Sequence, residues 1–181
     1  MCKIVVIFKS LTKNDLSLII KIQKELFPEH IAKINYEESL VGKTDNEYFL
    51  IYVANECIGI LGIYHYPSDY ENAWLDWFGI LKQYRRKGHG SKIIRHFESI
   101  AKERGFKFAR LYTDKYINDA AISFYKSLGY VSEDYKNDSD PAHKDYHILI
   151  FSKLLDSYSL KLWNNRSIHL IEQVKLCSTK S

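Results

Sequence analysis

The sequence has few residues of the kinds that divide or cross-link a chain. Only three prolines and eight glycines occur in 181 residues, and no repeat, low-complexity tract or Pro/Gly/Ser linker marks a boundary. The length is close to the commonest domain size, so we expect one globular domain. Cys2, Cys57 and Cys177 show neither C-x-x-C nor Cys/His ligand spacing. This predicts a reduced, cytoplasmic protein without a metal site.

Long hydrophobic runs are also missing. The N-terminal apolar run Ile4 to Phe8 has five residues, whereas a signal peptide needs about 7 and a membrane span about 20. We therefore expect no membrane partner. The formal charge of +4 and pI near 8.8 suit a small polyanionic ligand but fall short of the pI above ~9 typical of nucleic-acid-binding domains. A nucleic-acid contact at Lys82 to Lys87 is the weaker alternative.

Hydrophobic periodicity predicts a mixed α/β sheet. Residues Thr12 to Asn14 can cap a first helix that Pro28 ends or bends away. A second helix follows Gly90 and is capped by Gly105, with apolar residues on one face and charged residues on the other. A third runs over residues 118–129. Strands are expected at residues 3–9, 48–54, 57–66, 73–81, 106–113, 130–134 and 146–155.

The segment Gln83 to Gly90 joins a predicted strand to the amphipathic helix. Gly88 and Gly90 let the backbone approach a ligand closely, and free amides at a helix N-terminus bind anions. A pyrophosphate would fit there, with further charge from the neighbouring basic side chains. An ordinary basic turn is the other interpretation. The P-loop and Rossmann fingerprints are both absent.

Two motifs in this order resemble the GNAT superfamily of N-acetyltransferases. Arg85, Gly88 and Gly90 fill its signature [Q/R]-x-x-G-x-[G/A], five residues after the apolar Ile80. Residues 118–130, NDAAISFYKSLGY, resemble its N-x-x-A-x-x-F-Y-x-x-x-G-[F/Y] motif. The resemblance is strong from Trp74 to Tyr130 and weak before Tyr48.

The resemblance implies a splayed mixed sheet of six to seven strands flanked by helices, over residues 1–155, with acetyl-CoA as co-substrate. The pantetheine arm would enter where the fourth and fifth strands part. The implied coenzyme contacts are the backbone of Phe78, Gly79 and Ile80, the loop residues Arg85, Arg86, Lys87, Gly88, His89, Gly90 and Ser91, and Asn118.

By its position in the second motif, Tyr125 would lie near the coenzyme sulfur. A phenol with an ordinary pKa near ~10 stays protonated at neutral pH and can protonate a departing thiolate. The resemblance therefore implies that Tyr125 is the general acid. Its other interpretation is a buried aromatic beside Phe124 and Leu128.

An amine acceptor must lose a proton, because an ammonium with a pKa near ~10.4 is almost fully charged at pH 7. Asp76 is the carboxylate on the fourth strand, where many family members have a base, commonly glutamate. Desolvation between Trp74 and Trp77 would raise its pKa. Alternation predicts that Asp76 shares a face with Trp74 and Phe78 and opposes Trp77. A structural Asp bonded to nearby backbone is the alternative, as is His65 as base.

The resemblance implies acetyl transfer to a primary amine by direct attack in a ternary complex, and a non-catalytic acyl-CoA sensor is the alternative. Carboxylates around the open end of the sheet could attract a cationic amine, although solvated loop charges are their default interpretation: Glu29, Glu37, Glu38, Asp69 and Glu71. Aromatic residues predicted at the same end could wall an amine pocket or simply fill the core: Tyr64, Tyr66, Tyr70, Trp74 and Trp77.

The extension at residues 156–181 lies beyond the family pattern. Its apolar residues, among them Trp163 and Ile168, are too many for a solvated tail. We expect it to pack on the domain or on a second subunit, which would make the protein a homodimer.

Overall fold

The computed structural model describes residues 5–66, 69–116, 118–136, 147–156, 159–164, 166 and 168. The chain divides into two compact units, Met1–Ala109 and Arg110–Ser181, which we describe in turn. The described residues form both helices and strands, seven strands in all, which confirms the mixed α/β class. None of the helices in these ranges is long and apolar enough to cross a bilayer.

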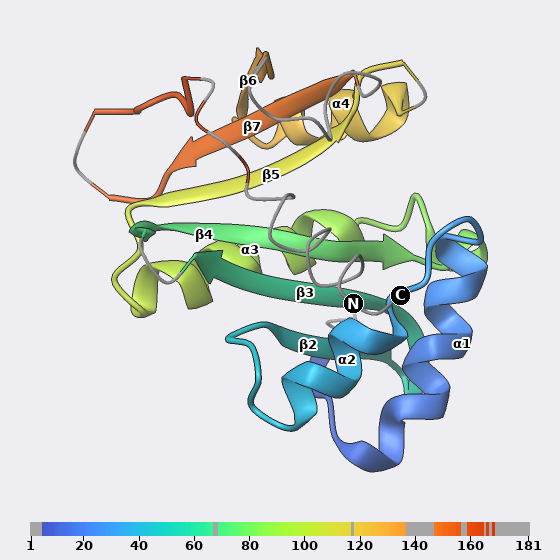
Figure 1. Cartoon of the computed structure of the whole chain (residues 1–181). Coiled ribbons are helices and arrows are strands. Elements are labelled where there is room, and N and C mark those ends of the chain that lie inside the picture. The colour runs from blue at the N-terminus through green and yellow to red at the C-terminus, as the bar shows by residue number, and fades with distance from the viewer. Residues whose placement is uncertain are drawn as a thin grey trace. The chain divides into compact units, whose positions relative to one another are not determined.

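Four antiparallel strands form the sheet of the first unit (Figure 1): β1 (Val6–Ser10), β2 (Glu47–Val53), β3 (Glu56–Tyr66) and β4 (Asp69–Ile80), adjacent in that order. The β2–β3 connection has two residues, Ala54 and Asn55, both with positive φ. That conformation matches the right-handed twist of a tight hairpin. Short connections therefore fix the antiparallel order that the sequence predicts.

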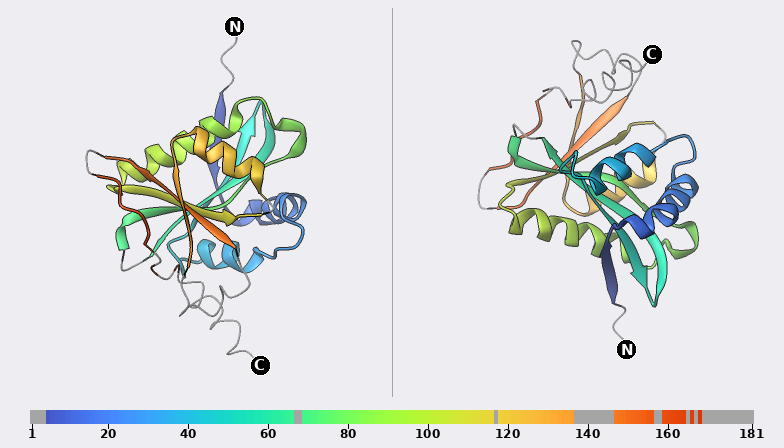
Figure 2. Two further views of the ribbon diagram at one scale, coloured as in Figure 1. Left: turned by 90° about the horizontal axis from the view of Figure 1, so that it is seen from above. Right: turned by 60° about the horizontal axis from the view of Figure 1, so that its bottom comes forward.

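Helices cover both faces of this sheet (Figure 1 and Figure 2). The helices α1 (Leu16–Leu26) and α2 (Lys33–Leu40) lie on one face, and α3 (His89–Glu103) lies on the other. The two 3₁₀ turns η1 (Lys13–Asp15) and η2 (Lys82–Tyr84) precede α1 and α3. At η1 the amide and hydroxyl of Thr12 both donate to Asp15 Oδ2, which fixes the start of α1.

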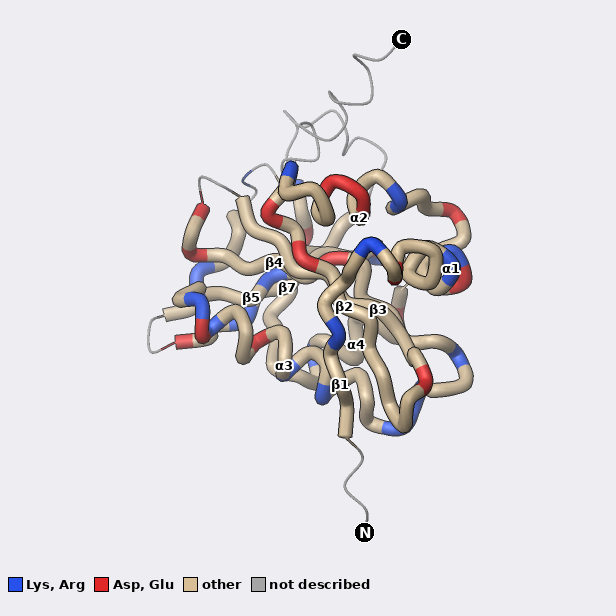
Figure 3. Tube along the Cα trace, turned by 90° about the horizontal axis from the view of Figure 1, so that it is seen from below, with Lys and Arg blue, Asp and Glu red and all other residues tan. Residues whose placement is uncertain are grey.

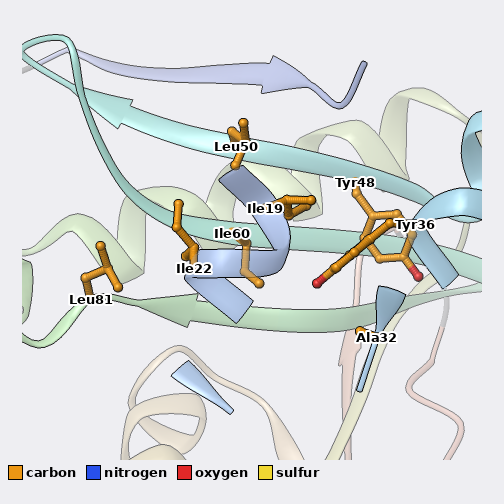
Figure 4. Packing of buried hydrophobic residues seen from close by; sticks show 8 residues of the cluster. All are labelled: Ile19, Ile22, Ala32, Tyr36, Tyr48, Leu50, Ile60 and Leu81. Atoms are coloured by element: carbon orange, nitrogen blue, oxygen red, sulfur yellow. The ribbon is translucent and has the colours of Figure 1, made fainter. Parts of the chain in front are cut away.

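The core under α1 and α2 is made of eight buried residues (Figure 4): Ile19, Ile22, Ala32, Tyr36, Tyr48, Leu50, Ile60 and Leu81. In β2, Tyr48 and Leu50 point into this cluster, whereas the alternate residues Phe49 and Ile51 are buried on the other face, which α3 covers. Strand alternation thus supplies both layers of core from one strand.

The second unit contains α4 (Asp119–Ser127) and the strands β6 (Val131–Asp134) and β7 (Ile148–Leu154), with β7 between β6 and β5 (Phe108–Asp114). The strand β5 begins at the end of the first unit and continues into the second. Its Arg110 is fully buried and donates to Ser152 Oγ and to the backbone oxygen of Lys161, 2.8 Å away. A buried guanidinium therefore joins two strands to the C-terminal segment.

The described part of the C-terminal segment packs on its own unit. The amides of Trp163 and Asn164 donate to the two carboxylate oxygens of Glu133, at 3.0 and 2.7 Å. The indole of Trp163 lies 5.3 Å from the Arg110 guanidinium, and the amide of Ile168 donates to Tyr135 Oη. Both Trp163 and Ile168 are buried. The domain boundary at residue 155 and a second subunit stay predictions.

Most element positions agree with the sequence pattern, and one helix does not. The helix α3 spans His89–Glu103, and Gly105 follows it at φ +85°, as expected of a C-terminal cap. The helix α2 has no counterpart in the prediction, because only Tyr36 of its eight residues is buried and its apolar residues show no helical stripe. The polar stretch over residues 136–144, which the sequence pattern leaves between two strands, lies outside the described residues except for Lys136.

We expect Trp163→Ala to lower the free energy of unfolding by about 3 kcal/mol or more, because it empties a buried aromatic site and uncovers Arg110. Leu162→Ala is the matched control, since Leu162 is 38% exposed whereas Trp163 is 2% exposed; the control should change stability by less than about 0.5 kcal/mol. Urea unfolding of both variants measures the difference. Equal stabilities would show that the segment does not pack as described.

Candidate active site

The loop between β4 and α3 adopts an unusual backbone. Arg86 and Gly88 have φ of +63° and +76°, and Gly88 is the N-cap of α3. A Cβ built on Gly88 would meet nothing within 4 Å, so glycine is needed there for its conformation and not for space. The positive φ of these two residues turns the chain into the first turn of α3, where the backbone amides point out of the helix N-terminus.

These amides form an anion site. The Arg85 amide is bonded to the Lys82 carbonyl at 3.3 Å, whereas the amides of residues 86–91 have no backbone acceptor outside α3 among the described residues. The first four amides of an α-helix have no acceptor within it either, and they carry the positive end of the helix dipole. The loop can therefore bind a phosphate or pyrophosphate.

The basic side chains of the loop differ in their contacts. Arg85 Nε donates to the Ile80 carbonyl at 2.7 Å and so ties the loop to the end of β4. Lys87 Nζ lies 5.5 Å from the Tyr84 ring. His89 is buried, and that burial together with Lys92 and Lys87 lowers its pKa, so its imidazole is neutral at pH 7. Its Nδ1 has no hydrogen-bond partner among the described residues.

A bulge interrupts β4 before this loop. Ile60 pairs with Gly79, but Gly62 pairs with Asp76, so β4 has one more residue than β3 over this stretch. Trp77 within it has φ +40°, which is rare for a residue with a Cβ. The bulge lies next to Phe78, Gly79 and Ile80, the residues expected to contact the pantetheine arm.

The bulge overturns the predicted opposition of Asp76 and Trp77. Asp76 bonds to Tyr48, and Trp77 packs against the same core cluster as Tyr48. Both residues therefore face the layer under α1 and α2, because an extra residue cancels strand alternation. The sequence pattern assumes a regular strand and cannot register this change.

Asp76 has the environment of a base. Its Oδ2 accepts a hydrogen bond of 2.9 Å from Tyr48 Oη. Burial raises the pKa of Asp76 to about 6, and hydrogen bonds from Tyr48 and from the Trp77 amide partly oppose that rise. The residue keeps some accessible surface although its carboxyl is largely desolvated. At pH 7 it is a carboxylate able to accept a proton.

The segment after α1 is held over the bulge. Gln23 is buried, and its Nε2 donates to the backbone oxygens of Phe27 and His30 at 3.4 and 2.8 Å. The Phe27 ring contacts Trp77 edge-on at 5.3 Å, and the His30 ring lies 5.6 Å from Trp77. A Cβ on Gly79 would meet Leu26 Cδ1 at 2.8 Å, so this glycine allows the end of α1 to approach β4.

Two buried donors in this layer have no partner among the described residues: Tyr36 Oη and Trp77 Nε1. Tyr36 is fully buried, and the charge of Asp76 adds to the burial that raises its pKa. Buried polar groups are normally hydrogen-bonded, to solvent or ligand if not to protein. The unpartnered Tyr36 hydroxyl close to a carboxylate therefore indicates a place for a polar ligand or an ordered water.

The second unit contains Tyr125 and Asn118. Tyr125 is buried on α4 with its ring against those of Tyr130 and Phe151, and burial raises its pKa, so the phenol keeps its proton. Asn118 precedes α4 but makes no side-chain cap; instead its Nδ2 donates to Thr113 Oγ1 at 2.9 Å. The side chain of Asn118 therefore does not cap α4.

Most of the expected acceptor carboxylates are engaged within the protein. Glu71 pairs with Lys107 at 2.6 Å, Glu37 with Lys33 at 3.6 Å, and Asp69 accepts from Asn72. The acidic residues of α2 appear in red in Figure 3. Glu29 is exposed. The default interpretation of solvated or paired charges therefore describes this set.

The five aromatic residues expected at one end of the sheet do not form one wall. Tyr64 and Tyr66 contact the buried Trp74, but Trp77 lies with Phe27, and Tyr70 is exposed. His65 lies 3.9 Å from Asp45, which suits a structural imidazole. Among the described residues, no group of three or more His, Cys, Asp or Glu side chains could hold a metal ion.

Sequence reasoning missed Tyr48, Tyr36 and Asn46. All three surround Asp76 or its hydrogen-bond donor, but they come from β2, α2 and the connection between them. The only advance signal was Gly62, since glycine within a strand often marks a close approach of another group.

Comparisons with known proteins find similar sequences and similar folds. A probable N-acetyltransferase 14 from Xenopus tropicalis is 36% identical over 63 residues, which cover 35% of this chain and 30% of that protein, so the chain matches well under two thirds of this relative's length. A putative GNAT acetyltransferase from Desulfovibrio desulfuricans superposes with a TM-score of 0.71 at 14% identity, over 84% of this chain and 100% of that one.

A spermidine N-acetyltransferase from Vibrio cholerae, solved with CoA and spermine, gives a TM-score of 0.66 at 15% identity, over 83% of this chain and 95% of that chain. These likenesses show the fold expected from the two motifs. The family description "Acetyltransferase (GNAT) family" matches residues 16–130. The chain is therefore a member of the GNAT acetyltransferase family.

Proposed function

We propose that the protein transfers acetyl from acetyl-CoA to a primary amine by direct attack in a ternary complex. The observation that carries this proposal is Asp76, a desolvated carboxylate with a pKa of about 6 near the buried Tyr36, whose hydroxyl has no partner among the described residues. A module that only bound a coenzyme would have no use for a base there. The spermidine N-acetyltransferase from Vibrio cholerae, solved with CoA and spermine, is a fold neighbour whose ligands match this chemistry.

The coenzyme site would combine the anion loop with the end of β4. The amides of residues 86–91 suit a pyrophosphate, and Arg85, Arg86 and Lys87 add charge around it. Backbone groups of Phe78, Gly79 and Ile80 would bond to the pantetheine arm, and the motif over residues 118–130 assigns Asn118 a contact with that arm. The bulge at Trp77 turns the backbone at the point where that arm would begin its contacts.

The proton transfers are assigned to two residues of this chain. Asp76 takes one proton of the acceptor's ammonium, since a carboxylate with a pKa of about 6 is ionised at pH 7. As the C–N bond forms and the C–S bond breaks, Tyr125 gives its proton to the departing sulfur, and its phenolate takes the second proton from the attacking nitrogen. Burial keeps the phenol neutral until that step. Acetyl-CoA supplies the acetyl group in activated form, as a thioester. No covalent enzyme intermediate is required, so the acceptor must bind before the thioester is consumed.

The first experiment is a calorimetric titration with acetyl-CoA, followed by a thiol-release screen across polyamines, amino acids and peptides with free N-termini. Binding together with amine-dependent thiol release would support the proposal. Binding without release for any amine would favour the sensor alternative, and the absence of binding would refute both.

Gly88→Ala should weaken coenzyme binding roughly tenfold, because an alanine resists φ +76° by about 1–2 kcal/mol and its relaxation would turn the loop amides away. Gly42→Ala is the matched control. Gly42 has a similar φ of +69° and equally open surroundings, but it follows α2, outside the loop. Calorimetry should show CoA affinity unchanged in the control, and equal losses in both variants would count against the loop.

Tyr125→Phe should lower kcat about 100-fold and leave the CoA dissociation constant nearly unchanged, because only the transferable proton is removed. Tyr116→Phe is the control, since Tyr116 is an exposed tyrosine of the same unit. Steady-state thiol release and CoA titration separate the two quantities. An unaltered kcat would leave Tyr125 a buried packing residue.

Asp76→Asn should lower kcat/KM by about 100-fold and remove a pH dependence centred near 6. In the wild type, kcat/KM should fall as the pH drops through 6, since protonation removes the base, and should be retained above it. The measurement is the pH profile from 5 to 9 for both proteins. A limb near pH 6 that persists in the Asn variant would assign it to another group.

A further inference from the structure

Tyr48, Gly62 and Asp76 form a straight row across three strands. In the sheet register Tyr48 pairs with Gly62, and Gly62 pairs with Asp76. Neighbouring strands are about 4.8 Å apart, so roughly 10 Å separates the backbones of the two outer residues. Paired residues point to the same face, which here is the face under α1 and α2. A tyrosine side chain is long enough to bridge that gap.

The bridge exists because the middle residue has no side chain. A Cβ on Gly62 would lie 2.8 Å from Tyr48 Cε1 and 2.9 Å from Cδ1, closer than atoms in contact can be. The Tyr48 ring therefore lies over the backbone of β3 at Gly62. Its hydroxyl reaches Asp76 Oδ2 at 2.9 Å on the far side.

The direction of this hydrogen bond is fixed by its neighbours. Asn46 Nδ2 donates to Tyr48 Oη at 3.2 Å, so the tyrosine's own hydrogen is left for Asp76. Ser39 Oγ donates to the backbone oxygen of Asn46 and anchors that residue to α2. The ring of Tyr36 meets the Tyr48 ring edge-on, with centroids 4.7 Å apart, as Figure 4 shows.

We infer that Tyr48, laid across Gly62, is a positioning residue for Asp76: its hydroxyl holds the carboxylate in one orientation and favours its ionised form. This inference rests on the proposed role of Asp76 as base. A buried carboxylate without such a donor would favour its neutral form and could not accept a proton. Tyr48 thus offsets part of the desolvation that the site imposes.

Among the groups that affect the pKa of Asp76, Tyr48 is the hydrogen-bond donor that a side-chain substitution can remove. Tyr48 faces it from β2 and Tyr36 from α2, whereas β3 contributes only Gly62. Among the described residues, no lysine, arginine or histidine adds a charge effect to its titration. The remaining donor is the Trp77 amide, which belongs to the backbone.

The primary test is Tyr48→Phe, read by the ¹³C shift of the Asp76 carboxyl in protein labelled at aspartate Cγ. The resonance is assigned by its loss in Asp76→Asn. Loss of a donor to a charged acceptor should raise the pKa of Asp76 by about one pH unit or more. In the acetyl-transfer assay, kcat/KM at pH 6 should fall roughly five- to tenfold and recover at pH 9. A merely structural defect would not be reversed by pH.

Tyr52→Phe is the matched control, because it removes a hydroxyl from the same strand. Tyr52 is influenced by Lys9, Asp15 and Cys57 and not by Asp76. Its variant should leave the Asp76 titration unchanged. Gly62→Ala is the second test: its Cβ would displace both the Tyr48 ring and the Asp76 backbone oxygen, which lies 2.8 Å away, so it should shift the Asp76 titration in the same direction as Tyr48→Phe. Thermal melting confirms that each variant is folded.

The outcomes separate the two ideas. If Asp76→Asn leaves the rate unaltered, the base assignment fails, and the carboxyl titration still shows whether Tyr48 acts on Asp76. If Asp76→Asn is inactive but Tyr48→Phe changes neither the titration nor the pH profile, the base assignment stands and the inference about Tyr48 is wrong.

Discussion

The bulge in β4 at Trp77 is the constraint on which the candidate site depends. One extra residue, with φ +40°, lets Asp76 and Trp77 face the same layer. Trp77 then supports the segment after α1 through Phe27, while Asp76 meets Tyr48. In a regular strand one of these two residues would point to the opposite face of the sheet, which would separate the Asp76 carboxylate from the Trp77 ring.

Glycines with different physical roles make the rest possible. Gly88 supplies a left-handed N-cap for α3, which leaves the loop amides free for an anion. Gly62 and Gly79 instead supply space, the first for the Tyr48 ring and the second for Leu26. The loop before α3 thus depends on backbone conformation, whereas the surroundings of Asp76 and Trp77 depend on close approach.

The sequence was sufficient for the parts that depend on local patterns. The strand–loop–helix from β4 to α3 and the motif over residues 118–130 are contiguous, and their helical periodicity and turn residues are visible in one dimension. The row from Tyr48 to Asp76 depends on the register of three strands, and Tyr36 is the one buried residue of α2. Alternation also failed at Trp77, since no residue type announces a bulge there.

Gln23 fixes the backbone of the segment after α1 but not its side chains. Its Nε2 donates to the carbonyl oxygens of Phe27 and His30, so these hydrogen bonds do not depend on which side chains those two positions carry. Substitution at exposed positions such as His30 would alter the chemical lining next to Trp77 while the backbone keeps its course. Point changes here would therefore alter the surface beside Trp77 and leave the hydrogen bond between Tyr48 and Asp76 in place.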